Sequence, residues 1–316
     1  MELTQLKKQL ATHEYDERLG DIYGSSSKEI NSARERLEAL VEWYAEEFGS
    51  VEGASNVALY TAPGRTEMGG NHTDHQQGAV LAGSVTLDMV ACAAPNGTRT
   101  ARIMSQGYPE ITVDLRDLVP VAGEEGTSQS LVRGIAAAMA DRGYAPQGFN
   151  AVIYSAVPGG SGLSSSAAYE ILIGVILNHL FCTDSLAPAE LAQIGQFAEN
   201  SFFGKPSGLM DQMGSALGGV AHLDFKDPAH PVIHPIPFDM EKTGYALCII
   251  DSGADHADLT DDYTAIRSEM KQVAACFGKD VLREVDPADF WKAIPQLRAA
   301  TNDRAVLRAM HFFGDH

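Results

Sequence analysis

Pro158-Gly-Gly-Ser-Gly-Leu-Ser-Ser-Ser-Ala-Ala168 is the stretch on which the fold of this 316-residue chain depends. The run before it, residues 151–157, is short, apolar and rich in β-branched residues, as in a buried strand. After it, apolar residues recur at helical spacing, which predicts a helix that begins near Ser165 or Ser166. A glycine-rich turn at a helix N-terminus presents unpaired backbone N–H groups to an anion. We therefore expect this turn to bind phosphate, with serine hydroxyls available to a phosphate oxygen or to Mg²⁺.

Other motifs with a similar composition fit this stretch less well. A Walker loop needs a lysine after its last glycine, but Leu163 and Ser164 follow Gly162. The dinucleotide-binding fingerprint needs a glycine where Ser165 stands. A nucleophile elbow needs a glycine on the C-terminal side of its serine, and none is present. On this stretch alone, a tight strand-to-helix connection with a serine cap and no ligand stays open.

Length and composition indicate a globular protein of two domains. Hydrophobic residues make up 45% of the chain and charged residues 21%, as in ordinary folded proteins. The formal net charge of −19 opposes binding to nucleic acid and to anionic membranes, which both need a basic surface. An anionic ligand must therefore be held locally, by backbone dipoles, a few cations or a metal ion.

Cysteine usage and the N-terminus indicate a cytoplasmic protein, which we expect to be a monomer. Cys92, Cys182, Cys248 and Cys276 lie far apart in mainly apolar surroundings, so we expect buried free thiols. No apolar run reaches membrane-spanning length, and the N-terminus lacks the apolar core of a signal peptide.

Hydrophobic patterns predict helices first, then strands and helices in alternation. Residues 1–48 predict helices, with a capping box from Ser26 to Glu29 and an apolar stripe that ends at Gly49. Asn96-Gly97 predicts a hairpin turn between two neighbouring strands. We expect strands at residues 57–62, 87–94, 98–104, 111–115, 151–157, 220–225, 232–236 and 245–251. We expect further helices at residues 129–142, from 165 or 166 to about 182, from 188 onwards, and at 263–277 and 303–313.

A second unusual stretch, Pro63-Gly-Arg-Thr-Glu-Met-Gly-Gly-Asn-His-Thr-Asp-His75, follows the first of these strands. Its glycines predict a constrained loop rather than a solvated one. His72, Asp74 and His75 are possible metal ligands, but they lack a well-spaced further partner. Neutral and anionic acceptors beside donors suit a polyhydroxylated ligand better, because each sugar hydroxyl both donates and accepts.

A third stretch, Gly208-Leu-Met-Asp-Gln212, follows the helix that Pro188 opens. Taken singly, Asp211 reads as a helix cap, and Glu199, near the end of that helix, as a solvated charge. Lys205, between the two, is a possible phosphate contact, although it reads more readily as a solvated loop lysine.

Together the three stretches resemble the motifs of the galactokinase family, within the GHMP small-molecule kinases. Pro63-Gly-Arg-x-x-x-x-Gly-x-His-Thr-Asp74 is similar to the galactokinase signature, and residues 158–168 to the second GHMP motif. Gly208-Leu-Met-Asp-Gln212 is similar to the galactokinase catalytic segment. The resemblance runs from about Val57 to the end of the chain.

The resemblance implies roles for individual residues. It implies that Asp211 is the general base and that Arg65 is its cationic neighbour. The sugar site would include Asn71, His72, Thr73, Asp74 and Tyr263. The ATP phosphates would be wrapped by Gly160, Ser161, Gly162, Leu163, Ser164, Ser165 and Ser166, and Mg²⁺ would be held by Ser166 and Glu199.

The implied fold is α+β with two domains. Residues 1–50 would be a helical extension, and residues 51–218 a domain like domain 2 of ribosomal protein S5. Residues 219–316 would be an incomplete ferredoxin-like domain. The implied activity is Mg²⁺-dependent transfer of a phosphoryl group from ATP to the C1 hydroxyl of D-galactose, in a cleft between the domains.

The sequence departs from the family's usual pattern in two ways, and each leaves an alternative function open. The family usually has glutamate where Asn71 stands, so N-acetylgalactosamine or another related sugar is an alternative substrate. No third glycine-rich segment, normally found near the family's C-terminus, is present in these 316 residues. A galactokinase-like protein that binds sugar and ATP without turnover is therefore the alternative from another functional class.

Overall fold

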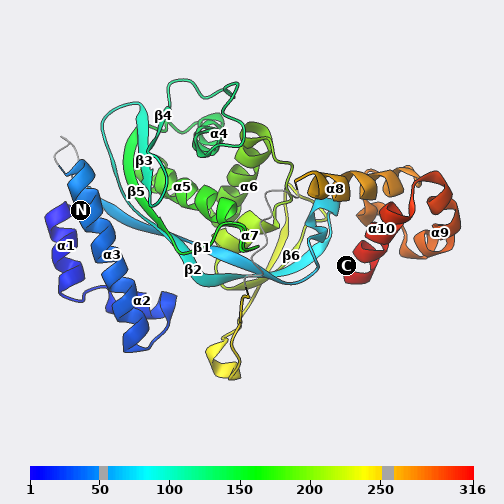
Figure 1. Cartoon of the computed structure of the whole chain (residues 1–316), viewed down its shortest axis with the longest axis horizontal. Coiled ribbons are helices and arrows are strands. Elements are labelled where there is room, and N and C mark those ends of the chain that lie inside the picture. Colours follow the sequence, from blue (N-terminus) through cyan, green and yellow to red (C-terminus); the bar gives the residue numbers. More distant parts are fainter. Residues whose placement is uncertain (50–55, 251–259) are drawn as a thin grey trace.

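A seven-stranded sheet with helices on both faces forms the body of the molecule (Figure 1). The computed structural model describes residues 1–49, 56–250 and 260–316. Six strands lie in the order β4-β3-β5-β2-β6-β7, and β1 pairs with β2. The strands are β1 (Ala58–Gly69), β2 (Ala79–Pro95), β3 (Thr100–Ser105), β4 (Ile111–Asp114), β5 (Phe149–Ser155), β6 (Val220–Asp224) and β7 (Val232–Ile236).

The long strand β2 separates two hydrophobic cores. Successive side chains of a strand point to opposite faces, so Met89, Ala91 and Ala93 contribute to the core under the central helices. Val90 and Cys92 contribute to the core under the N-terminal helices. Burial on both faces fixes the register of β2, because a slip of one residue would exchange the two faces.

The helices form three groups (Figure 1). The N-terminal group cover one face of the sheet, the central group cover the other, and the C-terminal group lie at the end of the molecule opposite the N-terminal helices. The groups are α1 (Leu3–Ala11), α2 (Asp16–Tyr23) and α3 (Ser27–Phe48); α4 (Ser128–Asp141), α5 (Ser165–Phe181), α6 (Pro188–Ala198) and α7 (Met210–Leu217); and α8 (Thr260–Ala275), α9 (Pro287–Ala300) and α10 (Asp303–Asp315). Short helical turns are η1 (Thr73–Gln76), the π-helix η2 (Glu199–Phe203), η3 (Glu241–Thr243) and η5 (Leu282–Glu284).

Three local helix signals are confirmed. The Ser26 side chain accepts a hydrogen bond from the Glu29 N–H, and the Glu29 carboxylate accepts one from the Ser26 N–H, so the predicted capping box is present. The predicted apolar stripe of α3 is buried to Phe48. Helix α5 begins at Ser165, as predicted.

The predicted hairpin at Asn96-Gly97 is wrong. β2 and β3 are not neighbours, because β5 lies between them and pairs with β2 antiparallel and with β3 parallel. The Asn96 side chain, just after β2, links the ends of the three strands: it donates to the Thr100 carbonyl of β3 at 2.9 Å and to the Asn150 side chain of β5 at 2.8 Å. A turn signal reports a change of direction but not which strand fills the space beside it.

The predicted loop at residues 63–75 is also wrong over its first half. β1 continues to Gly69, with register shifts between Pro63 and Arg65 and between Glu67 and Gly69. These irregularities let a strand rich in glycine and polar residues stay paired with β2. The chain leaves the sheet only between Gly70 and Gly78, and the segment from Gly70 to Gln77 is called the polar turn below.

The strands expected to begin a separate domain at residue 219 extend the main sheet instead. β6 pairs with β2 and β7 pairs with β6, so the chain remains in this sheet beyond residue 218. Residues 245–250 of the predicted strand 245–251 are not a strand, and Tyr245 and Ile250 are 81% and 88% exposed. Asp251 lies outside the described residues. The α+β class is confirmed, and the division into domains stays a prediction.

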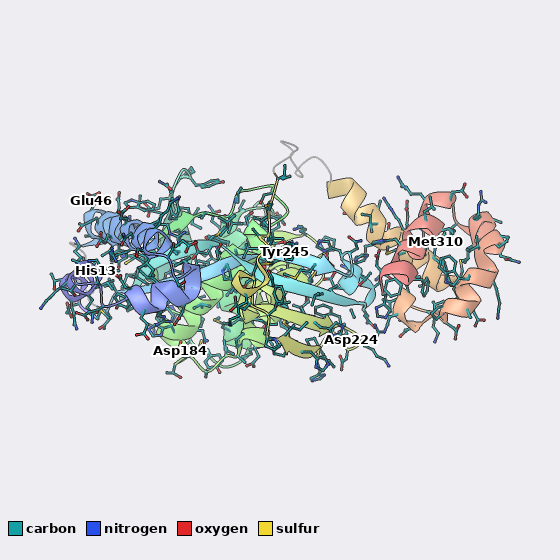
Figure 2. The ribbon with its side chains drawn as sticks, turned by 90° about the horizontal axis from the view of Figure 1, so that it is seen from below. His13, Glu46, Asp184, Asp224, Tyr245 and Met310 are labelled. Carbon is teal, nitrogen blue, oxygen red and sulfur yellow. The ribbon has the colours of Figure 1, made fainter. Side chains whose placement is uncertain are left out.

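The helical group that ends the chain has its own core, separate from the sheet (Figure 2). Phe290 and Phe312 are fully buried in it. In the described ranges, every helix is too short or too polar to cross a lipid bilayer.

The expectation of buried thiols is correct for two cysteines and wrong for two. Cys92 and Cys182 are buried, whereas Cys248 and Cys276 are exposed. Cys276 is the first residue after α8 and Cys248 lies in the irregular segment after η3, so neither position has a packed layer above it.

Candidate active site

The predicted phosphate turn, residues 158–166, connects β5 to the N-terminus of α5. Gly160 and Gly162 have positive φ angles of 69° and 76°, which glycine adopts at little cost. Among the described residues, no acceptor bonds the backbone N–H groups of Gly160, Gly162 or Leu163. An anion is favoured at this end of the α5 dipole. The turn can therefore accept phosphate without losing an existing hydrogen bond.

Asp211, at the start of α7, is joined to the phosphate turn by two partners. The Nε and Nη2 atoms of Arg65 lie 2.7 and 2.6 Å from Asp211 Oδ1, and Ser164 Oγ donates to Oδ2 at 2.5 Å. Arg65 Nη1 also donates to the Gly162 carbonyl at 2.6 Å. Burial opposes the charge on Asp211, but Arg65, His72 and the hydrogen bonds outweigh it and hold the Asp211 pKa below its usual value. The carboxylate is thus kept ionised at the edge of the phosphate turn.

The polar turn carries Asn71 and His72 on its exposed side. Both have left-handed backbone conformations, with φ of 47° and 58°. The His72 N–H donates to Glu67 Oε1 at 2.8 Å. Thr73 is 1% exposed and its hydroxyl donates to the Ala79 carbonyl at 3.1 Å, so this side chain supports the turn instead of facing the site.

Asp74 joins the polar turn to the helix that carries Asp211. Its Oδ2 accepts from the backbone N–H of Met210, the first residue of α7, at 3.0 Å. The N–H groups of a first helical turn lack partners within the helix, so this carboxylate satisfies one of them and favours the helix dipole. Three separated stretches of sequence therefore meet at one place.

Glu199 is the buried acceptor beside the phosphate turn. Ser166 Oγ lies 3.5 Å from Glu199 Oε1, and Lys205 Nζ donates to the same oxygen at 2.8 Å. Oε2 accepts from Ser207 Oγ at 2.5 Å and from Gln212 Nε2 at 3.0 Å. One carboxylate and one hydroxyl fit Mg²⁺, which binds one or two protein groups together with substrate phosphates and water.

The other metal site considered above is not supported. Within the described residues, no three His, Cys, Asp or Glu side chains gather as ligands. His75 Nδ1 faces the His72 carbonyl at 2.5 Å, and Asp74 already accepts from α7.

Two family models match the chain at these stretches. The model of the GHMP kinases N terminal domain matches residues 130–219, which include the phosphate turn and Asp211. The model of the galactokinase galactose-binding signature matches residues 42–95, which include the polar turn.

Curated relatives extend the match over most of the chain. The galactokinase of Streptomyces coelicolor is 32% identical over 273 residues, which are 86% of this chain and 70% of the relative. The chain belongs to the galactokinase family. The galactokinase of Actinobacillus pleuropneumoniae serotype 3 is 34% identical over 278 residues, covering 86% of this chain and 69% of that protein.

A solved structure supports the same assignment. Lactococcus lactis galactokinase complexed with galactose matches with a TM-score of 0.72 and 26% identity. The match covers 89% of this chain and 71% of the other. The resemblance inferred from the three motifs is therefore confirmed at the level of the family.

Most of the residues predicted for the site of this galactokinase-family chain lie on the polar turn, the phosphate turn and the start of α7. Tyr263 falls in α8, and its side chain lies outside the described residues. Glu67 was missed as a member of the site, although it stands in the quoted signature stretch. Its position two residues after Arg65 on β1 places both side chains on one face of the strand, a signal available once β1 is known to reach Gly69.

Glu170 and Gln212 form a buried polar pair that sequence reasoning also missed. Gln212 Nε2 donates to Glu170 Oε2 at 2.9 Å and to Glu199 Oε2 at 3.0 Å, and so joins α5, α7 and η2. Glu170 is 1% exposed on a helix that is apolar on nearly all sides. Burial, and then the nearby charge of Glu199, raise the pKa of Glu170 well above its usual value.

We predict that Glu170→Gln makes the protein more stable relative to the wild type as pH rises. A group whose folded pKa is raised contributes its full stability below the unfolded pKa, and loses it as pH rises toward the folded pKa. The glutamine side chain of the variant does not ionise, so the variant does not lose stability in this way as the pH rises. The measurement is thermal unfolding of both proteins between pH 5 and 9, with exposed Glu110→Gln as the control. A difference that stays constant with pH would show that Glu170 is already ionised in the folded protein.

We predict that Gly208→Ala weakens the hydrogen bond by which Asp74 of the polar turn accepts from the N-terminus of α7. A Cβ at residue 208 would lie 1.8 Å from Asp74 Oδ2, so Asp74 must rotate away from the Met210 N–H. The lost charge-assisted bond should lower the free energy of unfolding by about 1–3 kcal/mol, measured in urea. Gly159→Ala is the matched control, because a Cβ there meets nothing within 4 Å. Equal effects of both substitutions would contradict the role of Asp74.

Proposed function

We propose that this chain is a galactokinase, which transfers the γ-phosphoryl group of ATP to the C1 hydroxyl of D-galactose. The observation that carries the proposal is Asp211, held by Arg65 and Ser164 at the junction of the phosphate turn and the polar turn. Family membership supports the reaction class, because the matched relatives are galactokinases.

The ATP phosphates would bind at the phosphate turn. The unpaired N–H groups of Gly160, Gly162 and Leu163 would each donate to a phosphate oxygen. In a protein of net charge −19, such local donors are the means of holding a polyanion. Lys205 pairs with Glu199 while its side chain stays 49% exposed, and from there it would reach a phosphate oxygen.

Asp211 would take the proton of the attacking hydroxyl. A sugar hydroxyl is a weak nucleophile, and a positioned carboxylate that accepts its proton typically contributes roughly 10²- to 10⁴-fold in rate. Arg65 keeps Asp211 ionised and would stabilise charge on the transferring group. The sugar would lie against Asn71, His72 and Asp74 on the polar turn.

We propose Ser166 and Glu199 as the protein groups that hold Mg²⁺. When bound, Mg²⁺ neutralises charge on the ATP phosphates during phosphoryl transfer. Lys205 pairs with the Glu199 carboxylate and Ser207 donates a hydrogen bond to it, which explains how this carboxylate can be buried.

The proposal includes a cytoplasmic monomer. Two exposed free thiols suit a reducing compartment, and the high net negative charge opposes self-association. Light scattering at working concentration would test the monomer.

The deciding experiment is ADP release coupled to a panel of sugars with Mg-ATP. We expect turnover with D-galactose. Asn71 makes N-acetylgalactosamine the second substrate to test, because an amide lacks the charge of the glutamate usual in the family. Tight binding of galactose and ATP by calorimetry, with no product from any sugar, would instead identify a non-catalytic binding protein.

A further inference from the structure

The C-terminal helix α10 contacts the polar turn. His311 Nε2 lies 3.0 Å from the Asn71 carbonyl oxygen, and His311 Nδ1 lies 2.6 Å from Asp315 Oδ2. The Asn71 side-chain amide donates to the same carboxylate oxygen at 3.4 Å. Both the backbone and the side chain of Asn71 are thus bonded to residues about 240 positions later in the sequence.

The polar turn needs an external support. Asn71 and His72 are consecutive residues with positive φ, and Gly70 before them has φ of 104°. A non-glycine residue in this conformation costs roughly 1–2 kcal/mol and persists only where its surroundings fix it. Glu67 fixes the His72 N–H from the side of β1, and α10 supplies the corresponding contact to Asn71.

His311 makes the stronger of the α10 contacts. One ring nitrogen faces a carbonyl oxygen and the other a carboxylate, and both of these are acceptors. Together the two contacts set the orientation of the ring against Asn71.

Two more contacts hold the chain at the far end of the polar turn and at the start of β2. The Leu282 N–H donates to Gln76 Oε1 at 3.1 Å, and Gln76 is fully buried. The Ala79 N–H, where β2 begins, donates to His316 Nδ1 at 3.1 Å. Residues from Leu282 to His316 therefore contact the segment from Asn71 to Ala79 at both of its ends.

We propose that His311 and Asp315 are positioning residues for sugar recognition. By fixing the backbone of Asn71 and His72 and the direction of the Asn71 amide, they set the affinity for the sugar, and leave the phosphate turn unaffected. This inference rests on the proposed function only in naming galactose as the ligand of the polar turn.

The experiment compares His311→Phe with His230→Phe. Phenylalanine keeps a flat ring and has no N–H. His230 pairs with Asp227 at 3.0 Å on the surface, which matches the pairing of His311 with Asp315 without a contact to the polar turn. We expect His311→Phe to raise KM for galactose roughly 10-fold, about the size of one hydrogen bond, and to leave KM for ATP unchanged. His230→Phe should change neither.

Two further readouts separate positioning from general stability. Asp315→Asn keeps a carbonyl oxygen that can accept from Asn71 and should retain more sugar affinity than Asp315→Leu. Hydrogen–deuterium exchange of a peptide spanning residues 67–79 should be faster in His311→Phe than in the wild type, without galactose or ATP present. Unchanged exchange together with an unchanged galactose KM would overturn the proposal.

The exchange measurement keeps the two proposals distinguishable. If the wild type neither binds nor phosphorylates galactose, the proposed function fails. Faster exchange in His311→Phe would still show that the contact of His311 with Asn71 stabilises the polar turn. If the wild type phosphorylates galactose and the variant matches it in exchange and in KM, only the positioning role fails.

Discussion

Replacing Asp211 by asparagine is expected to lower kcat for galactose phosphorylation by roughly 10²- to 10⁴-fold, the usual contribution of a general base. The amide keeps the shape of the side chain: its oxygen can still accept from Arg65, and its NH₂ group can donate to the Ser164 hydroxyl. It cannot accept a proton from the sugar. KM for ATP should change little, because the phosphate turn keeps its own unpaired N–H groups. The measurement is coupled ADP release at saturating galactose and Mg-ATP.

The matched control is Asp114→Asn, which makes the same chemical change at an exposed aspartate paired with Arg116. Its kcat should equal that of the wild type. Wild-type rates in Asp211→Asn would reject the assigned base, and the proposed mechanism with it. A large rise in KM for galactose at unchanged kcat would instead make Asp211 a binding residue.

The pKa of Asp211 adds a second expectation to this prediction. Because Arg65 and its other partners outweigh burial and lower this pKa, the base stays ionised on acidification below the usual range of aspartate. Lowering the pH from 7 to 5 should therefore not reduce kcat through Asp211. In Arg65→Met the guanidinium no longer outweighs burial, so the pKa of Asp211 should rise. The kcat of this variant should then fall as the pH is lowered from 7 to 5.

The sequence predicted the local backbone structure around the candidate site, and the roles of its residues stay predictions. The phosphate turn follows from glycines before a helix start, and α5 begins at the residue expected. Asp211 and Arg65 were assigned from motifs, and the structure brings their side chains to 2.6 Å. Local signals suffice here because backbone conformation and helix ends are set by neighbouring residues.

The parts that were missed depend on which strands become neighbours. Asn96-Gly97 gives the correct position for a turn, but β5 enters the sheet between β2 and β3 from some 50 residues later. β6 joins β2 in the same way, so the sheet crosses the boundary expected at residue 218. Strand pairing over long sequence separations is decided by burial of whole faces, which no short window contains.

Glu170 was missed for a related reason. Its helix reads as an entirely apolar element, and one glutamate in it resembles an exposed charge. Its partner Gln212 stands beside the catalytic candidate in the sequence, but only the fold shows that the amide reaches both Glu170 and Glu199. A buried network of this kind is visible only after three helical segments are packed.

Glu199→Gln is the second prediction with a large expected effect, and it tests the metal assignment. Glu199 accepts from Lys205 at one oxygen and from Gln212 at the other, so an NH₂ group at either position faces a donor. The substitution also leaves Lys205 without a negative partner at 2.8 Å. We expect the free energy of unfolding to fall by about 2–3 kcal/mol, from loss of charge-assisted hydrogen bonds at a buried site.

The same substitution should raise the Mg²⁺ concentration needed for half-maximal activity by at least roughly 10-fold, since a weakened metal site typically loses 10- to 100-fold in metal affinity. Titration of ADP release with Mg²⁺ at fixed ATP measures this. Glu190→Gln on α6 is the control, because glutamine can still accept from the Ala187 N–H at the helix start. A variant that loses stability but keeps the wild-type Mg²⁺ titration would make Glu199 a structural acceptor for Lys205, Ser207 and Gln212. The metal would then have to be held by ATP and the hydroxyls of the phosphate turn, with Ser166 as the remaining protein ligand.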